Sequence, residues 1–194
     1  MDNKLHSALA KDLNQEVYDI TEGGIYFPRH GLLASGEYFD RVNGGEWQRT
    51  ENLVPKESRI AMLNTYLGSK AKPAGFYLAL FSGSTAPADN WTGASFAAAA
   101  NEIVSQTEGY AGASRPQFTP ADAVDNTYID NFASYARVTI ATSGSLNVTG
   151  AALLTSQARG ATTGTLISAT KYAAARVFRD GDTFDIGYRF ALSN

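Results

Sequence analysis

The sequence predicts a mainly β protein: an antiparallel β-sandwich or jelly-roll-like domain with one or two short helices and an extended N-terminal arm. Three observations predict this class. Short apolar or alternating runs recur through the second half of the 194-residue chain. Turns rich in Gly, Ser and Thr separate them at the spacing of about 8–12 residues that is typical of sandwiches. The last run, from Thr183 to Leu192, alternates with a period of two, as a strand does.

Residues 1–52 are expected to form the arm. It opens with a predicted short helix, in which leucines recur every four residues at positions 5, 9 and 13. Aromatic strand-like pieces follow at 25–27 and 37–39. Because the arm holds few aliphatic residues, its aromatic rings must pack either on the main domain or on another subunit. Seven arm residues are candidates for partner contact: Tyr26, Phe27, Arg29, Tyr38, Phe39, Arg41 and Trp47.

Residues 53–194 are expected to form the β-rich domain, which opens with a helix at about 55–67. Pro55 suits the first helical position, where its missing N–H would be unsatisfied anyway. Gly68 suits a left-handed stop after the helix. One face of the predicted helix is apolar, and it consists of Ile60, Leu63, Tyr66 and Leu67.

The rest of this domain is predicted to be antiparallel β-structure. The apolar run at 76–81 is expected to be a core strand. The alternating runs at 136–141 and 146–150 flank Ser143-Gly144-Ser145 and predict a hairpin. Between these strands, residues 87–131 form a long excursion with a short helix predicted at 95–104, and long ordered excursions are usually functional. Further strands are predicted at 151–155, 165–170, 174–179 and 183–192.

No catalytic template fits the chain, so we expect neither enzyme activity nor a cofactor. Cysteine is absent, which excludes thiolate nucleophiles, disulfides and Cys-based metal sites. The two histidines, His6 and His30, are expected to be solvated or packing residues of the arm. The Gly-x-Ser-x-Gly elbow of hydrolases and the lysine-containing phosphate loop are both missing.

The candidate metal ligands are Asp180, Asp182 and Asp185, because calcium takes oxygen ligands from such acidic clusters. Two features favour a structural role instead. In the predicted strand, Asp182 and Asp185 fall on opposite faces. A tight Asp-Gly hairpin turn also explains the cluster without an ion. We therefore expect no metal.

Charge and hydropathy restrict the partners. The net charge is −3, the pI is near 5.4 and basic runs do not exceed two residues, which argues against nucleic-acid binding. No signal peptide is recognised, and apolar runs such as those at 76–81 and 96–100 are far below the roughly 18 residues of a membrane span. The protein is expected to fold in the cytoplasm and to contact neither nucleic acid nor membrane.

From residue 53 onward, several segments carry a family resemblance. They are Leu53-Val54-Pro55, the run at 76–83, Pro87-Ala88-Asp89-Asn90-Trp91-Thr92, the run at 96–99 with Glu102, and the run at 158–166. In this order they resemble small virion structural proteins of tailed bacteriophages. The resemblance covers about three quarters of the chain, and the first 50 residues lie outside it.

The resemblance implies a virion protein that docks onto other chains, and it supplies no catalytic residues. The leading interpretation is a capsid decoration, or cement, protein that contacts the major capsid protein or other virion proteins and forms homo-oligomers. A neck, tail or fibre-attachment component is the alternative. A carbohydrate-binding β-sandwich that uses exposed aromatic rings is an alternative of another class.

Overall fold

The computed structural model describes residues 19–21, 24–26 and 33–193, which belong to two compact units. The first unit comprises residues 1–33 and 193–194, and the second comprises residues 34–192. In the first unit, β1 (Asp19–Thr21) pairs antiparallel with β2 (Gly24–Tyr26), and Ile20 lies opposite Ile25. The helix predicted around the leucines at 5, 9 and 13 lies outside the described residues.

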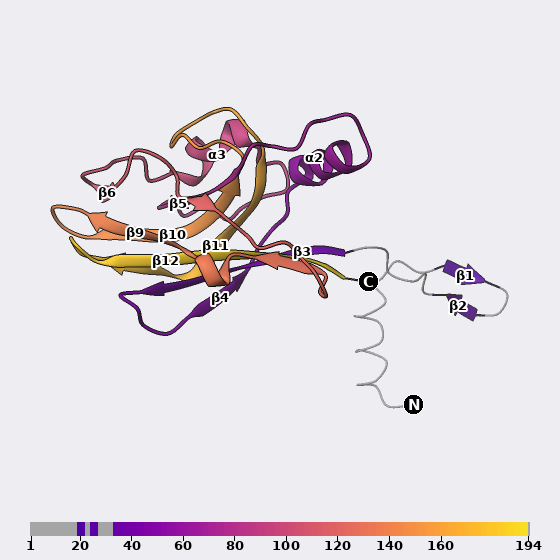
Figure 1. Ribbon diagram of the computed structural model, residues 1–194, viewed down its shortest axis with the longest axis horizontal. Helices are drawn as coiled ribbons and strands as arrows, with labels where there is room; N and C mark the ends of the chain where they lie inside the picture. The colour runs from indigo at the N-terminus through magenta and orange to yellow at the C-terminus, as the bar shows by residue number, and fades with distance from the viewer. Residues whose placement is uncertain (1–18, 22–23, 27–32, 194) are drawn as a thin grey trace. The chain divides into compact units, whose positions relative to one another are not determined.

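The second unit consists of two β-sheets and two helices. Its strands are β3 (Leu33–Val42), β4 (Gln48–Glu51), β5 (Phe76–Phe81), β6 (Gly109–Tyr110), β7 (Gln117–Phe118), β8 (Tyr128–Asp130), β9 (Ala136–Ala141), β10 (Leu146–Leu154), β11 (Leu166–Phe178) and β12 (Thr183–Ser193). One sheet has the order β11-β10-β5-β7, and the other has the order β4-β3-β12-β9-β6, with β8 also paired to β12. The two sheets lie face to face, and α2 (Lys56–Tyr66) and α3 (Gly93–Ala100) lie on the side of the four-stranded sheet (Figure 1). The predicted mainly β, sandwich-like fold is confirmed.

The core between the sheets follows from the alternation of the strands. In β12, Phe184, Ile186 and Tyr188 face inward and are fully buried, as the period of two predicts. From the opposite sheet, Leu78 and Leu80 of β5 enter the same core. The sandwich is thus held by apolar burial from both inner faces, which is the main stabilising term in such folds.

A second core lies on the outer face of the four-stranded sheet. Ala79 and Phe81 of β5 point to this side, where Phe96 of α3 and Trp91 cover them. Strand β5 is therefore buried on both faces, which explains its uninterrupted apolar sequence.

The local signals at the helix ends differ from expectation in detail. Pro55 caps α2 from an extended conformation (ψ 165°), one residue before the first helical position. Gly68 lacks the predicted left-handed φ. The helix predicted at 95–104 is displaced toward the N-terminus, because Thr92 and Ser95 form a reciprocal capping box and Asn101 ends the helix with a φ of 53°. No helix of the described segments is long and apolar enough to cross a membrane.

The predicted hairpin of 136–141 and 146–150 is wrong, although both strands form. Strand β9 pairs with β12 and β6, whereas β10 pairs with β5 and β11, so the intervening turn crosses from one sheet to the other. The turn at 180–182 likewise joins β11 to β12 across the sandwich and is not a hairpin. Alternation identifies the buried face of a strand but not its neighbour, because both sheets direct apolar residues into one core.

Several predicted short strands are continuous in the structure. The pieces at 146–150 and 151–155 form the single strand β10, and those at 165–170 and 174–179 form β11. At the joint of β10, a register shift surrounds Gly150. A Cβ there would lie 2.2 Å from the Phe81 ring, so only glycine fits.

The predicted boundary between residues 52 and 53 is also wrong. Strands β3 and β4 belong to the six-stranded sheet, and the compact second unit begins at Ala34. Tyr38 is fully buried, and its hydroxyl lies 2.7 Å from the Ser168 hydroxyl, while its ring packs on Tyr188. Tyr38 thus finds its partners among tyrosine and serine side chains of the same domain.

Truncation tests this corrected boundary. A chain starting at Leu33 is expected to be soluble and to melt cooperatively within a few degrees of the full-length protein. A chain starting at Leu53 is expected to misfold, because removing β3 and β4 exposes one edge of β12 and opens the core around Tyr188. Circular dichroism and thermal melting of the two chains provide the comparison. A well-folded chain from Leu53 onward would restore the original boundary.

Candidate functional site

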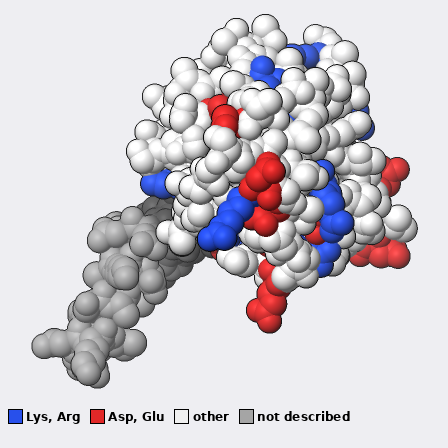
Figure 2. Space-filling view, turned by 90° about the vertical axis from the view of Figure 1, so that its left-hand side faces the viewer, with Lys and Arg blue, Asp and Glu red and all other residues white. Residues whose placement is uncertain are grey.

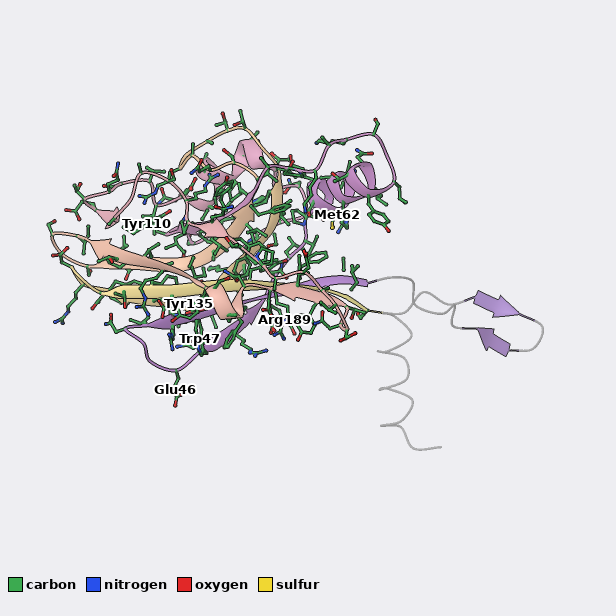
Figure 3. The ribbon with its side chains drawn as sticks, in the orientation of Figure 1. Glu46, Trp47, Met62, Tyr110, Tyr135 and Arg189 are labelled. Atoms are coloured by element: carbon green, nitrogen blue, oxygen red, sulfur yellow. The ribbon has the colours of Figure 1, made fainter. Side chains whose placement is uncertain are left out.

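An aromatic cluster lies on the outer face of the six-stranded sheet. Trp47, in the β3–β4 turn, packs between Phe132 and Tyr135, with ring centroids 5.2 Å from each. Phe39 of β3 lies below, 5.6 Å from Trp47 and 5.1 Å from Phe132. The Arg41 guanidinium stacks 4.5 Å from the Trp47 centroid and donates a 2.8 Å hydrogen bond to the Tyr135 hydroxyl. We call these five residues the Trp47 cluster, and Figure 3 shows Trp47 and Tyr135 together on this side.

A buried carboxylate holds the cluster in place. Asp185 of β12 lies between Arg41 of β3 and Arg137 of β9, and its side chain is fully buried. Arg41 Nε donates to it at 2.7 Å, and Arg137 donates through Nε at 2.5 Å and Nη2 at 2.8 Å. Burial by itself raises the pKa of Asp185, but the hydrogen bonds and charges of Arg137 and Arg41 outweigh it, and the net pKa lies below the ordinary 3.8. One carboxylate therefore ties three neighbouring strands together.

Polar pairs continue along the same face. Arg189 of β12 binds Asp130 of β8 through Nε and Nη2 at 2.9 and 2.7 Å, and it lies 3.4 Å from Glu37 of β3. Along β12, Gly187 lies between Arg189 and Asp185 and leaves room for the Phe39 ring. A Cβ on Gly187 would lie 2.0 Å from this ring. In the end-on view of Figure 2, acidic and basic side chains are interspersed on this half of the molecule. The charges therefore pair with one another and leave the aromatic rings as the distinctive feature.

The structure unites three of the seven predicted contact residues and places a fourth, Tyr38, in the core. Phe39, Arg41 and Trp47 belong to the Trp47 cluster. Tyr38 points to the opposite face of the sheet and is buried in the core, so it is not available for a partner. The side chain of Tyr26 is not described. Phe27 and Arg29, and also His6 and His30, lie outside the described residues.

Sequence reasoning did not anticipate Phe132 and Tyr135. They lie in and just after the 3-10 helix η1 (Phe132–Ser134), more than 80 positions from Trp47 in the chain. Phe132 is 41% exposed, whereas Trp47 and Tyr135 are half-buried and Phe39 is buried. Phe132 is therefore the most accessible ring of the Trp47 cluster. Spacing along the sequence carries no signal for such a contact, because strand pairing creates it.

A second surface lies on α2, whose apolar side faces away from its own domain. The four large side chains on this side, including the C-cap residue Leu67, are exposed: Ile60 by 48%, Leu63 by 60%, Tyr66 by 88% and Leu67 by 76%. We call these four residues the α2 face. The opposite side of the helix, which packs near β11, consists of smaller or more polar residues together with one methionine: Ser58, Ala61, Met62 and Thr65. The sequence predicted the apolar face correctly, but not that it would lie in water.

Polar anchors fix this orientation of α2. Glu57 Oε2 accepts hydrogen bonds from the backbone N–H groups of Gly93 and Leu166, both at 2.7 Å. Arg59 donates to the Val54 carbonyl at 3.2 Å and to Asp89 at 2.9 Å. The Glu57 contacts come from α3 and the start of β11, and the Asp89 contact comes from the loop before α3, so the helix is held at its N-terminal end with its apolar side outward.

The long excursion at 87–131 is anchored to the sandwich. Arg115 forms a two-point ion pair with Glu102 at 2.7 and 2.8 Å, and both side chains are completely buried. Arg115 also donates to the Ser156 carbonyl, and Glu102 accepts from the Gly160 N–H. Removing one partner of such a buried pair destabilises the fold, because the other charge is left buried without its partner. The pair therefore fixes these loops.

The carboxylates of the 180–182 turn have protein partners. Asp180 accepts from the Thr142 N–H at 3.1 Å. Asp182 accepts from the Arg179 N–H at 2.6 Å and from Asn43 at 2.9 Å. Asp185, the third candidate ligand, is held by arginines. Among the residues that the structure describes, no group of three or more His, Cys, Asp or Glu side chains could hold a metal ion.

Comparison with known proteins adds no assignment. No protein-family model matches the sequence, and no curated protein matches it significantly. The Trp47 cluster and the α2 face are therefore evaluated on their chemistry alone.

Substitution of Asp185 tests the support of the Trp47 cluster. Asp185→Asn should lower the free energy of unfolding at pH 7 by about 1–3 kcal/mol, because it leaves two guanidinium groups without their anion. A carboxylate whose pKa is lowered by folding stabilises the protein above its unfolded pKa and loses this effect as the pH falls. The deficit should therefore shrink below pH 4 or so.

Urea denaturation at pH 7 and pH 3 provides the measurement. Asp122→Asn, in an exposed loop, is the matched control and should change little at either pH. An Asp185→Asn deficit that is equal at both pH values would show that the charge of Asp185 does not support the sheet.

Proposed function

We propose that this chain is a virion structural protein of a tailed bacteriophage, a capsid decoration or cement protein that stabilises the shell through protein–protein contacts. Its partners are the major capsid protein or other virion proteins, together with further copies of itself. The role requires no catalytic group and no cofactor. The family resemblance of residues 53–166 motivates the setting.

The observation that carries the proposal is the α2 face. Exposed apolar patches formed by several large side chains mark interaction sites on folded proteins. Fully burying a side chain of this size contributes about 1.5–3 kcal/mol, so covering the α2 face would contribute several kcal/mol to association before its entropic cost. A shell presents many equivalent sites, so modest contacts of this kind are multiplied when copies also touch each other.

Labelling of virions tests the proposal. Antibodies raised against the second unit should decorate purified particles of the encoding phage across the head surface. Labelling confined to the neck or tail would favour the alternative of a neck, tail or fibre-attachment component. Absence of the chain from purified particles would refute both assignments.

A second candidate function, glycan binding, is favoured by the Trp47 cluster. Carbohydrate sites use aromatic rings as apolar platforms flanked by polar side chains. The rings of Trp47, Phe132 and Tyr135 adjoin one another, and the guanidinium of Arg137, which is 53% exposed, lies 5.9 Å from the Tyr135 centroid. Screening the purified protein on a glycan array is the direct test. Binding that is lost in Trp47→Ala but kept in Leu63→Asp would support this function. Absence of glycan binding would leave the assembly role.

A further inference from the structure

The surroundings of the α2 face are basic, although the whole chain is acidic. Residues 56–72 carry four cationic side chains, Lys56, Arg59, Lys70 and Lys72, against one carboxylate, Glu57. Glu57 is directed inward to two backbone N–H groups. Arg59 pairs with the half-exposed Asp89. Within the described residues, no carboxylate lies within ion-pair distance of the three lysines. The apolar side chains are thus bordered by positive charge.

This border argues against a second copy of the chain as the occupant. A two-fold contact of α2 with itself would bring the lysines of both copies together, and like charges at an interface cost free energy. The area is also small: four side chains supply several hundred Å², whereas a stable interface buries about 800 Å² on each partner. A flat helix-to-helix contact between two copies therefore lacks both charge complementarity and area.

A groove on another protein satisfies both conditions. Ile60, Leu63 and Leu67 follow the i, i+3, i+7 spacing by which a helix places its anchors in an apolar groove. Groove walls would also cover the aliphatic stems of Lys56 and Arg59, which enlarges the buried area. The helix is already fixed by Glu57 and Arg59, so little conformational entropy is lost on docking.

We propose that α2 docks into an apolar groove of a different protein, and that this groove is rimmed by Asp and Glu side chains. The apolar anchors supply affinity, and the lysines select an acidic rim and orient the helix within it. The inference deepens the proposed function by naming the contacting surface and the chemistry of the partner. It holds equally if that partner is not a virion protein.

Site-specific crosslinking in infected cells tests the proposal. A photoreactive amino acid replaces Leu63 in the full-length chain, and the adducts are identified by mass spectrometry. We expect an adduct with one different protein. Exchange of Lys56, Lys70 and Lys72 for Glu should lower its yield about tenfold, whereas exchange of the same lysines for Arg should preserve it. Adduct formation should also decrease as salt is raised in permeabilised cells.

Three outcomes would overturn the inference: an adduct with a second copy, no adduct at all, or an adduct insensitive to the Lys-to-Glu exchange. Flotation of the wild-type protein, but not of Leu63→Asp, with phosphatidylglycerol vesicles would assign the α2 face to a lipid surface instead. A charge-dependent adduct with a non-virion protein would refute the proposed function and leave this inference standing.

Discussion

Strand β12 lies in the six-stranded sheet between β3 and β9, and its two faces meet different environments. Its inward residues, Phe184, Ile186 and Tyr188, complete the core. Its outward residues are a carboxylate, a glycine and an arginine, and each of them contacts a different side chain of β3. The Trp47 cluster is thus a consequence of the same alternation that builds the core, since Arg41 meets Asp185 and Phe39 lies over Gly187.

The interior of the sandwich is not purely apolar, and this accounts for the position of the domain boundary. Asp40 of β3 is buried and accepts a hydrogen bond from Arg176 of β11 across the sheets. Without β3, the positive charge of Arg176 would have no negative partner there. Burial raises the pKa of Asp40, while the hydrogen bond and charge of Arg176 oppose that rise. Elsewhere in this core, burial raises the pKa of Tyr188 to about 12, although its hydroxyl accepts a hydrogen bond from Asn52. A segment with such contacts belongs to the domain and not to an arm.

Much of the fold could be predicted from periodicity, and the candidate surfaces only in part. Strands such as β5 and β12 follow from the runs at 76–81 and 183–192, because burial on one or two faces leaves a direct trace in sequence. Strand partners leave no such trace, so alternation predicts a hairpin at the turn 142–145 where none forms, and it gives no sign that Phe132 contacts Trp47. Arg41 and Trp47 were identified from residue type, but Tyr38 has the same character and is buried, because adjacent strand positions point to opposite faces.

The orientation of α2 is the feature that stability alone does not explain. Turning the helix by half a revolution would bury Leu63 and expose Ser58, a change that the hydrophobic effect favours. The sequence opposes it with directional contacts: Glu57 bonds two backbone N–H groups, and Arg59 bonds Val54 and Asp89. In natural proteins, local sequence preferences usually agree with the overall fold, and the exceptions are concentrated at functional sites. The polar anchors hold four apolar side chains in water, on the opposite side of the sandwich from the Trp47 cluster (Figure 3), and this arrangement is the reason for proposing that another molecule covers the α2 face.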